Sequence, residues 1–166
     1  MAFPADAHLD DPDDVLFRAV DVDAPGEVVF RWLCQLKLAP YSYDWIDNLG
    51  RRSPRELVPG VARLAVGQRF IIFTLVEFEP GRHITLVLRK NAAFGDVAFT
   101  YLVVPVTADR SRLVVKLLVR YPRTPVWGFA ARRVLPAGDL IMMRRQLLTF
   151  KKLAEATARG EIAVAD

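Results

Sequence analysis

The C-terminal quarter of the chain constrains the fold more than any other segment. The stretch "DLIMMRRQLLTFKKLAEATARG" (139–160) predicts a helix with Asp139 as its N-cap and Gly160 as its stop. One arc of this helix is mostly apolar and the opposite arc is charged. The apolar arc holds Met142, Met143, Gln146, Leu147, Phe150, Leu153 and Ala154. A helix of about 20 residues is about 30 Å long, so this arc needs a broad apolar surface to cover it, such as a curved sheet.

Four segments before the helix have the period of strands, at 69–78, 82–90, 96–106 and 111–122. In the last of them, "SRLVVKLLVRYP", apolar side chains occupy one face and basic side chains the other. The apolar face holds Leu113, Val115, Leu117, Val119 and Tyr121. In 82–90, Ile84, Leu86 and Leu88 are expected inward and His83, Thr85 and Arg89 outward. The pattern predicts an antiparallel sheet with one solvated face.

The first part of the chain predicts a strand over 16–25 and a helix over 26–38, "GEVVFRWLCQLKL", followed by a short helix at 43–49. The stretch 122–138 contains three prolines and two glycines and is expected to be irregular. The fold class is therefore α+β, a curved antiparallel sheet wrapped around a long C-terminal helix. Residues 1–14 are expected to be an acidic flexible tail, 15–160 a single domain and 161–166 a short tail.

The composition limits the classes of function. The hydrophobic fraction is 52%, yet no apolar run reaches the roughly 18 residues that a membrane helix needs. Residues 1–14 lack the basic start and apolar core of a signal peptide. A single cysteine, Cys34, provides no disulfide framework. We expect a cytoplasmic protein with Cys34 as a buried small hydrophobe.

The net charge of +4 is unevenly distributed. Residues 1–14 carry five of the 19 acidic residues and none of the 23 basic ones, so the rest of the chain carries +9. This balance would attract an anionic partner, although an arginine-rich solvated surface is the simpler interpretation. Arginines 51, 52, 55, 132, 133, 144 and 145 are the candidates for a nucleic-acid or anionic-membrane contact. No RNA-binding signature is present, so no nucleic acid is expected.

Three stretches resemble the SRPBCC superfamily (START-like, polyketide cyclase and lipid-transport proteins), in particular an uncharacterised bacterial subgroup. They are "VDVDAPGEVVFRWL", "GDLIMMRRQLLTFKKLAE" and "YSYDWIDNLGRRSPREL", the last followed by "VGQRF". The resemblance covers residues 16–160. It implies the helix-grip fold, with an apolar cavity between the sheet and the last helix that often holds a lipid or a polyketide. The superfamily shares no common catalytic motif, so the resemblance implies no reaction.

The aromatic stretch after the first helix is the first candidate site. Tyr41, Tyr43 and Trp45 fit either the core or a ligand site. The resemblance places the stretch near the cavity mouth, so Tyr43 and Trp45 are expected to contact a ligand as part of a lid or wall. Gln146 is the second candidate, because an unpaired amide on an apolar arc is costly. It either bonds a backbone group or faces the cavity. The expected ligand-binding set is Tyr41, Tyr43, Trp45, Phe73, Leu86, Tyr101, Met143, Gln146, Leu147 and Phe150.

Three functions are compatible with this reading. The first is binding or transport of a small hydrophobic, lipid-like or polyketide-like molecule without a cofactor. The second is a cyclase or dehydratase with Tyr43 or Asp44 as acid or base, although Asp44 and Asp47 also fit a solvated helix face. The third is a protein-binding module with an exposed apolar patch. A metal site is not expected, because the two histidines lack an H-x-x-H spacing and there is no cysteine pair.

Overall fold

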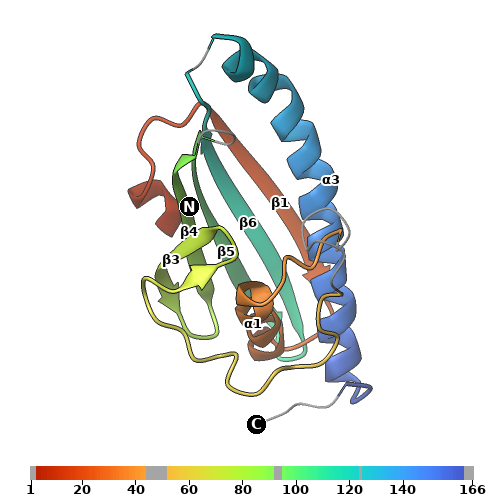
Figure 1. Ribbon diagram of the computed structural model, residues 1–166. Coiled ribbons are helices and arrows are strands. Elements are labelled where there is room, and N and C mark those ends of the chain that lie inside the picture. The colour runs from red at the N-terminus through yellow and green to blue at the C-terminus, as the bar shows by residue number, and fades with distance from the viewer. Residues whose placement is uncertain (1–2, 44–51, 92–94, 124, 163–166) are drawn as a thin grey trace.

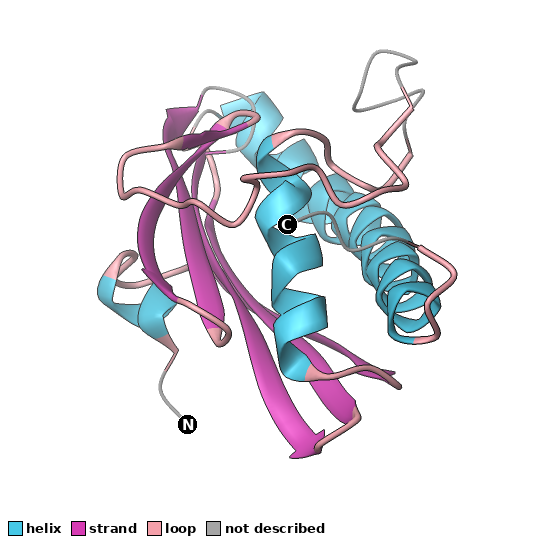
Figure 2. Cartoon of the chain, turned by 90° about the horizontal axis from the view of Figure 1, so that it is seen from below, coloured by secondary structure: helices cyan, strands magenta, loops and turns pink. Residues whose placement is uncertain are grey.

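The computed structural model describes residues 3–43, 52–123 except 92–94, and 125–162. Six antiparallel strands form one sheet in the order β1-β6-β5-β4-β3-β2. Two α-helices, α1 and α3, lie on one face of this sheet, and the short 3-10 helix η1 lies on the other (Figures 1 and 2). The strands are β1 (Asp14–Val22), β2 (Arg69–Phe70), β3 (Phe73–Glu79), β4 (His83–Asn91), β5 (Gly95–Thr107) and β6 (Arg110–Arg120). The helices are η1 (Pro4–Ala7), α1 (Gly26–Cys34), η2 (Gln35–Lys37) and α3 (Pro125–Ala158).

The long β5–β6 pair forms the centre of the core. Its register places Leu113 opposite Val103 and Val115 opposite Tyr101. These four side chains are buried beneath the helices. The apolar face predicted for 111–122 is confirmed, because alternate side chains of a strand point to the same side of a sheet.

Helix α1 follows Pro25, whose carbonyl accepts hydrogen bonds from Val28 and Val29. The predicted helix over 26–38 is present as α1 and η2. Its inward face buries Trp32, and the indole Nε1 donates a 3.0 Å hydrogen bond to Thr157 Oγ1 on α3. This bond joins the two helices inside the core.

Helix α3 begins at Pro125, well before the expected start at Asp139. The prediction that 122–138 is irregular, with Asp139 as an N-cap, is wrong. Pro136 and Gly138 suggested a break, because proline removes one helical hydrogen bond and glycine weakens helices. In the structure α3 continues through both residues and lies across the sheet. Tertiary packing therefore overrides the helix-breaking propensity of these two residues.

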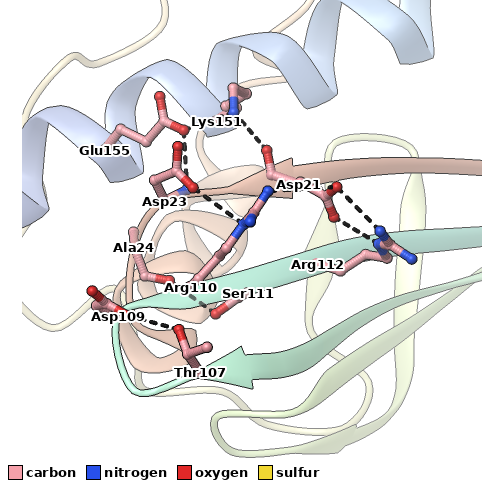
Figure 3. A network of polar contacts seen from close by, with 10 residues as sticks. All are labelled: Asp21, Asp23, Ala24, Thr107, Asp109, Arg110, Ser111, Arg112, Lys151 and Glu155. Atoms are coloured by element: carbon pink, nitrogen blue, oxygen red, sulfur yellow. Dashed lines mark hydrogen bonds and ion pairs between the residues drawn. The ribbon is translucent and has the colours of Figure 1, made fainter.

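A polar network holds the second half of α3 against the end of β1 (Figure 3). Lys151 Nζ donates a 2.6 Å hydrogen bond to the Asp21 carbonyl and forms a 2.8 Å ion pair with Glu155. Glu155 Oε1 accepts a 3.0 Å bond from the Asp23 backbone N–H. Arg112 on β6 pairs with the Asp21 carboxylate at 2.6 Å and lowers its pKa. The network therefore fixes β1, β6 and α3 relative to one another.

The single strand expected over 69–78 is two strands. β2 and β3 are joined by a tight turn at Ile71 and Ile72, with Phe70 paired to Phe73. Ile71 has a φ of 61°, an unfavourable region for a β-branched residue. The continuous apolar run "FIIF" contains no glycine, proline or asparagine that would have signalled a turn.

Residues 3–14 are not a loose tail. η1 and the residues after it pack on the outer face of the sheet, where Ala5 and Leu9 are buried with Val87, Ala98 and Leu118. The Ala5 N–H donates a 3.0 Å hydrogen bond to the buried Thr100 hydroxyl. The acidic composition suggested disorder, but these apolar side chains provide enough burial for the segment to pack.

This cover also corrects the expectation of one solvated sheet face. His83 and Thr85, predicted outward, are buried, and only Arg89 of the three is exposed. Thr85 Oγ1 lies 2.9 Å from Thr100 Oγ1, so the two hydroxyls share a hydrogen bond under the N-terminal segment. His83 lies 3.5 Å from a Glu77 oxygen on β3.

Replacing Leu9 with alanine tests whether the N-terminal segment is part of the folded domain. We expect Leu9→Ala to lower the free energy of unfolding by about 2 kcal/mol, because Leu9 is only 3% exposed and packs with Val87, Ala98 and Leu118. Urea denaturation measures the change. The matched control Leu38→Ala removes the same atoms from an exposed leucine and should change stability by less than about 0.5 kcal/mol. Equal effects of the two variants would mean that the segment contributes no packing energy.

Candidate functional site

A cavity of about 460 Å³ lies between the sheet and the first half of α3. The sheet contributes the inward side chains of β1, β4, β5 and β6, and α3 contributes the segment from Pro136 to Gln146. Residues 70–73, at the β2–β3 turn, complete the wall together with Leu36, Pro40 and Ser42. Ile71 and Ile72 line the cavity and are also exposed to solvent, so they mark its mouth.

Five of the ten expected ligand-binding residues line this cavity. They are Phe73, Leu86, Tyr101, Met143 and Gln146. Phe73 and Tyr101 each pack edge-on against Phe99, with ring centroids 4.8 and 5.5 Å apart. These three rings form one continuous aromatic wall on β3 and β5.

Three others do not line the cavity. Tyr41, Leu147 and Phe150 are buried in the packed core. The Tyr41 ring lies 5.2 Å from Phe150 and 6.3 Å from Trp32, and its hydroxyl accepts a hydrogen bond from Gln35 Nε2. Tyr41 is therefore a core residue that packs between α1 and α3, and it has no contact with the cavity.

The remaining two belong to the aromatic stretch after the first helix. Tyr43 is half-buried and is not part of the cavity wall; its ring lies 5.9 Å from the Arg145 guanidinium. Trp45 lies outside the described residues, as do Asp44, Asp47 and all but the start of the short helix expected at 43–49. Ser42, which neighbours them, does line the cavity.

Tyr101 and Gln146 form the polar point of the cavity. The Tyr101 hydroxyl donates a hydrogen bond to Gln146 Oε1, and Gln146 Nε2 donates a 2.5 Å bond to the Pro40 carbonyl. Both alternatives for Gln146 therefore hold, since it bonds a backbone group and also faces the cavity. Burial raises the pKa of Tyr101, and the nearby Asp139 raises it further. The hydroxyl is consequently a neutral hydrogen-bonding group and not a phenolate base.

Asp139 is the lining residue with the most distinctive chemistry, although its position in the sequence predicted an N-cap. Its carboxylate lies 3.4 Å from Arg18 Nη2 on β1. Burial raises the pKa of Asp139, and Arg18 opposes this only in part. A signal was available in the sequence: Asp139 lies four residues before Met143 and seven before Gln146, so one further helical turn places all three on one face.

Other reactive groups lie away from this cavity. Cys34 is buried in the packed core, and burial raises the pKa of its thiol to about 12, so it is not a nucleophile. His83 lies on the outer face of the sheet, beneath the N-terminal segment. Within the described residues no group of three histidine, cysteine or acidic side chains is placed to hold a metal ion.

Comparison with known proteins gives matches in structure but not in sequence. No family model matches the chain, and no curated protein matches it. Among solved structures, the aromatase/cyclase Zhui from Streptomyces sp. R1128 superposes with a TM-score of 0.57 at 18% identity, covering 91% of this chain and 99% of that one. Protein MLL2253 from Mesorhizobium loti gives a TM-score of 0.58 at 17% identity, with coverages of 87% and 98%.

The chain has the helix-grip fold. The superposed structures and the curved antiparallel sheet with its long C-terminal helix agree on this point. The sequence resemblance implied this fold. The di-domain aromatase/cyclase BexL from the BE-7585A biosynthetic pathway also superposes, with a TM-score of 0.53 at 15% identity. The match covers 87% of this chain and 47% of BexL, so the chain spans about half of that protein.

The Tyr101–Gln146 pair can be tested with a double-mutant cycle. Gln146→Leu should lower the free energy of unfolding by about 1–3 kcal/mol, because it leaves the Tyr101 hydroxyl and the Pro40 carbonyl without their partner. Tyr101→Phe should cost about 1 kcal/mol by leaving Gln146 Oε1 unpaired. The double variant should lose less unfolding free energy than the sum of the two single losses, by at least about 0.5 kcal/mol. Strict additivity in urea denaturation would show that the two side chains do not interact.

Proposed function

We propose that this protein binds a small hydrophobic molecule in the cavity between the sheet and α3. The observation that carries the proposal is the cavity itself. Its volume of about 460 Å³ lies within the range of about 300–1,000 Å³ usual for ligand pockets. Protein interiors are otherwise packed nearly as densely as organic crystals, so an apolar space of this size is expected to serve an occupant.

The wall indicates the chemistry of that occupant. Most of the lining is aliphatic or aromatic, and the aromatic wall of Phe73, Phe99 and Tyr101 favours a flat, unsaturated molecule. The Tyr101–Gln146 pair offers a neutral hydrogen bond that would orient one carbonyl or hydroxyl group. Two of the solved structures with this fold are aromatase/cyclases, which supports a polyketide-like ligand over a straight-chain lipid.

Filling the cavity tests this binding. We expect Leu86→Trp to weaken the binding of 1-aminoanthracene, a flat tricyclic fluorophore, by at least about tenfold, because the larger side chain occupies the space that the probe needs. Fluorescence titration gives the Kd. Val106→Trp adds the same ring at an exposed position on β5 and should leave the Kd unchanged. If the native protein and both variants bind the probe equally, the cavity is not the binding site.

A second function is favoured by Asp139. An enzyme of the dehydratase type needs an acid that protonates a leaving hydroxyl while a neighbouring C–H bond loses its proton to water, so that a double bond forms and water leaves. A buried carboxyl with a raised pKa is suited to that proton transfer. Asp139 takes the place of Tyr43 in this hypothesis, because Tyr43 does not line the cavity, and Asp44 lies outside the described residues.

The dehydratase function can be tested with 4-hydroxy-4-phenylbutan-2-one, whose dehydration is followed by the absorbance of the conjugated enone. Only protonated Asp139 can act as the acid, so the rate should fall as the pH rises through its raised pKa. Asp139→Asn should lower the rate by about 100-fold and remove this pH dependence. A variant as active as the native protein would exclude Asp139 as the acid. Binding without turnover would leave the carrier function as the better account.

A further inference from the structure

The side of α3 turned away from the sheet carries an apolar and basic surface that the cavity does not explain. We define the α3 outer face as Leu140, Ile141, Arg144, Arg145, Leu148 and Lys152. The three aliphatic side chains are 49%, 57% and 41% exposed, in chain order. All six lie on the arc opposite the residues that line the cavity or pack in the core, and Figure 1 shows α3 along one side of the molecule.

The charge of this face is of one sign. Residues 140–153 contain no aspartate or glutamate. Lys151, in the same stretch, is bound to the Asp21 carbonyl and to Glu155 and does not belong to the face. Arg144, Arg145 and Lys152 are exposed, and none of them has an ion-pair partner among the described residues. Their charges are therefore accessible to an anionic partner.

We propose that the α3 outer face docks on the surface of an anionic phospholipid membrane. Helices that lie in a membrane interface combine a basic side with aliphatic side chains that enter the boundary between headgroups and acyl chains. Anionic headgroups attract Lys and Arg within a Debye length of the surface. Leu140, Ile141 and Leu148 alternate with the three cations on this face, so both kinds of contact form in a single orientation.

The neighbouring contact of Tyr43 with Arg145 agrees with a membrane partner. The Tyr43 ring is half-buried and lies 5.9 Å from the Arg145 guanidinium, at the border of the α3 outer face. Tyrosine rings with a wet hydroxyl and an apolar body are frequent at membrane interfaces. A nucleic acid would use the three cations but would leave the three exposed aliphatic side chains against phosphates and water, which makes it the weaker candidate.

Membrane docking is a property separate from ligand binding, although the same helix serves both. Met142, Met143 and Gln146 line the cavity, whereas the residues of the α3 outer face lie on the opposite side of the helix. Docking would hold the cavity close to a phase in which hydrophobic molecules dissolve. The docking proposal is independent of the proposed ligand, since it can be tested with an empty cavity.

The test is co-sedimentation of the full chain with vesicles of phosphatidylcholine, with and without phosphatidylserine. We expect binding to the phosphatidylserine vesicles that weakens as salt is added. Arg144→Gln/Arg145→Gln/Lys152→Gln should lower the partition coefficient on the order of 100-fold, because each cation contributes about fivefold. The control Arg52→Gln/Arg55→Gln/Arg63→Gln removes three exposed arginines from the loop after the first helix and should change it by less than about threefold.

A third variant separates the membrane from other anionic partners. Leu140→Ser/Ile141→Ser/Leu148→Ser keeps every charge and should also weaken vesicle binding, by at least about tenfold, because its aliphatic groups no longer enter the interface. Three results would overturn the proposal. They are equal binding to the two vesicle types, equal losses in the two charge variants, or binding to a DNA duplex that competes with vesicles and is unaffected by the serine substitutions. Thermal unfolding of each variant verifies that it is folded.

Discussion

The attachment of the second half of α3 to the sheet and to α1 is the interaction on which the rest of the structure depends. Trp32 joins α1 to Thr157 inside the core, and Lys151 and Glu155 bind the end of β1 at Asp21 and Asp23. In this half, Leu147, Phe150 and Leu153 are buried in the main hydrophobic core. Along the first half of α3, residues from Pro136 to Gln146 line the cavity that lies between the helix and the sheet.

The division of α3 into a packed half and a half that lines the cavity explains why similar residue types have different roles. Phe150 and Tyr41 are aromatic, yet they pack against each other in the core. Phe73 and Tyr101 are also aromatic, but they face open space. The polar pair of Tyr101 with Gln146 lies near the boundary between the two halves. It satisfies its own hydrogen bonds with the help of Pro40, so a ligand can gain a polar contact without the protein paying for an unpaired amide.

Much of the fold follows from local periodicity. The alternation in 111–122 and the helical spacing of Trp32 and its neighbours depend on burial alone, and burial repeats with the geometry of the element. The errors have a common origin in contacts between distant segments. Pro136 and Gly138 end many helices, but here α3 lies against β1 through contacts such as the Arg18–Asp139 pair. Leu9 lies in an acidic segment, and its partners on β4, β5 and β6 come from residues about 80 or more positions away.

The candidate site was harder to predict than the fold, for a related reason. Phe73, Leu86, Tyr101, Met143 and Gln146 were found because each has an apolar or polar pattern on an inward face. Tyr41, Leu147 and Phe150 have the same pattern, and only the distance between α3 and the sheet decides that they are core. Asp139 was assigned to a helix end, because the start of α3 was predicted at Asp139, 14 residues after its actual start at Pro125.

Pro136 in the wall of the cavity has a mechanical consequence. Because proline has no N–H, the carbonyl of Arg132 lacks its usual helical donor, and the backbone bends more easily there than in an uninterrupted helix. The anchored half of α3 begins about ten residues after Pro136, so bending at Pro136 leaves the core packing intact. A bend at Pro136 would therefore change the shape of the cavity wall without altering the register of the six-stranded sheet.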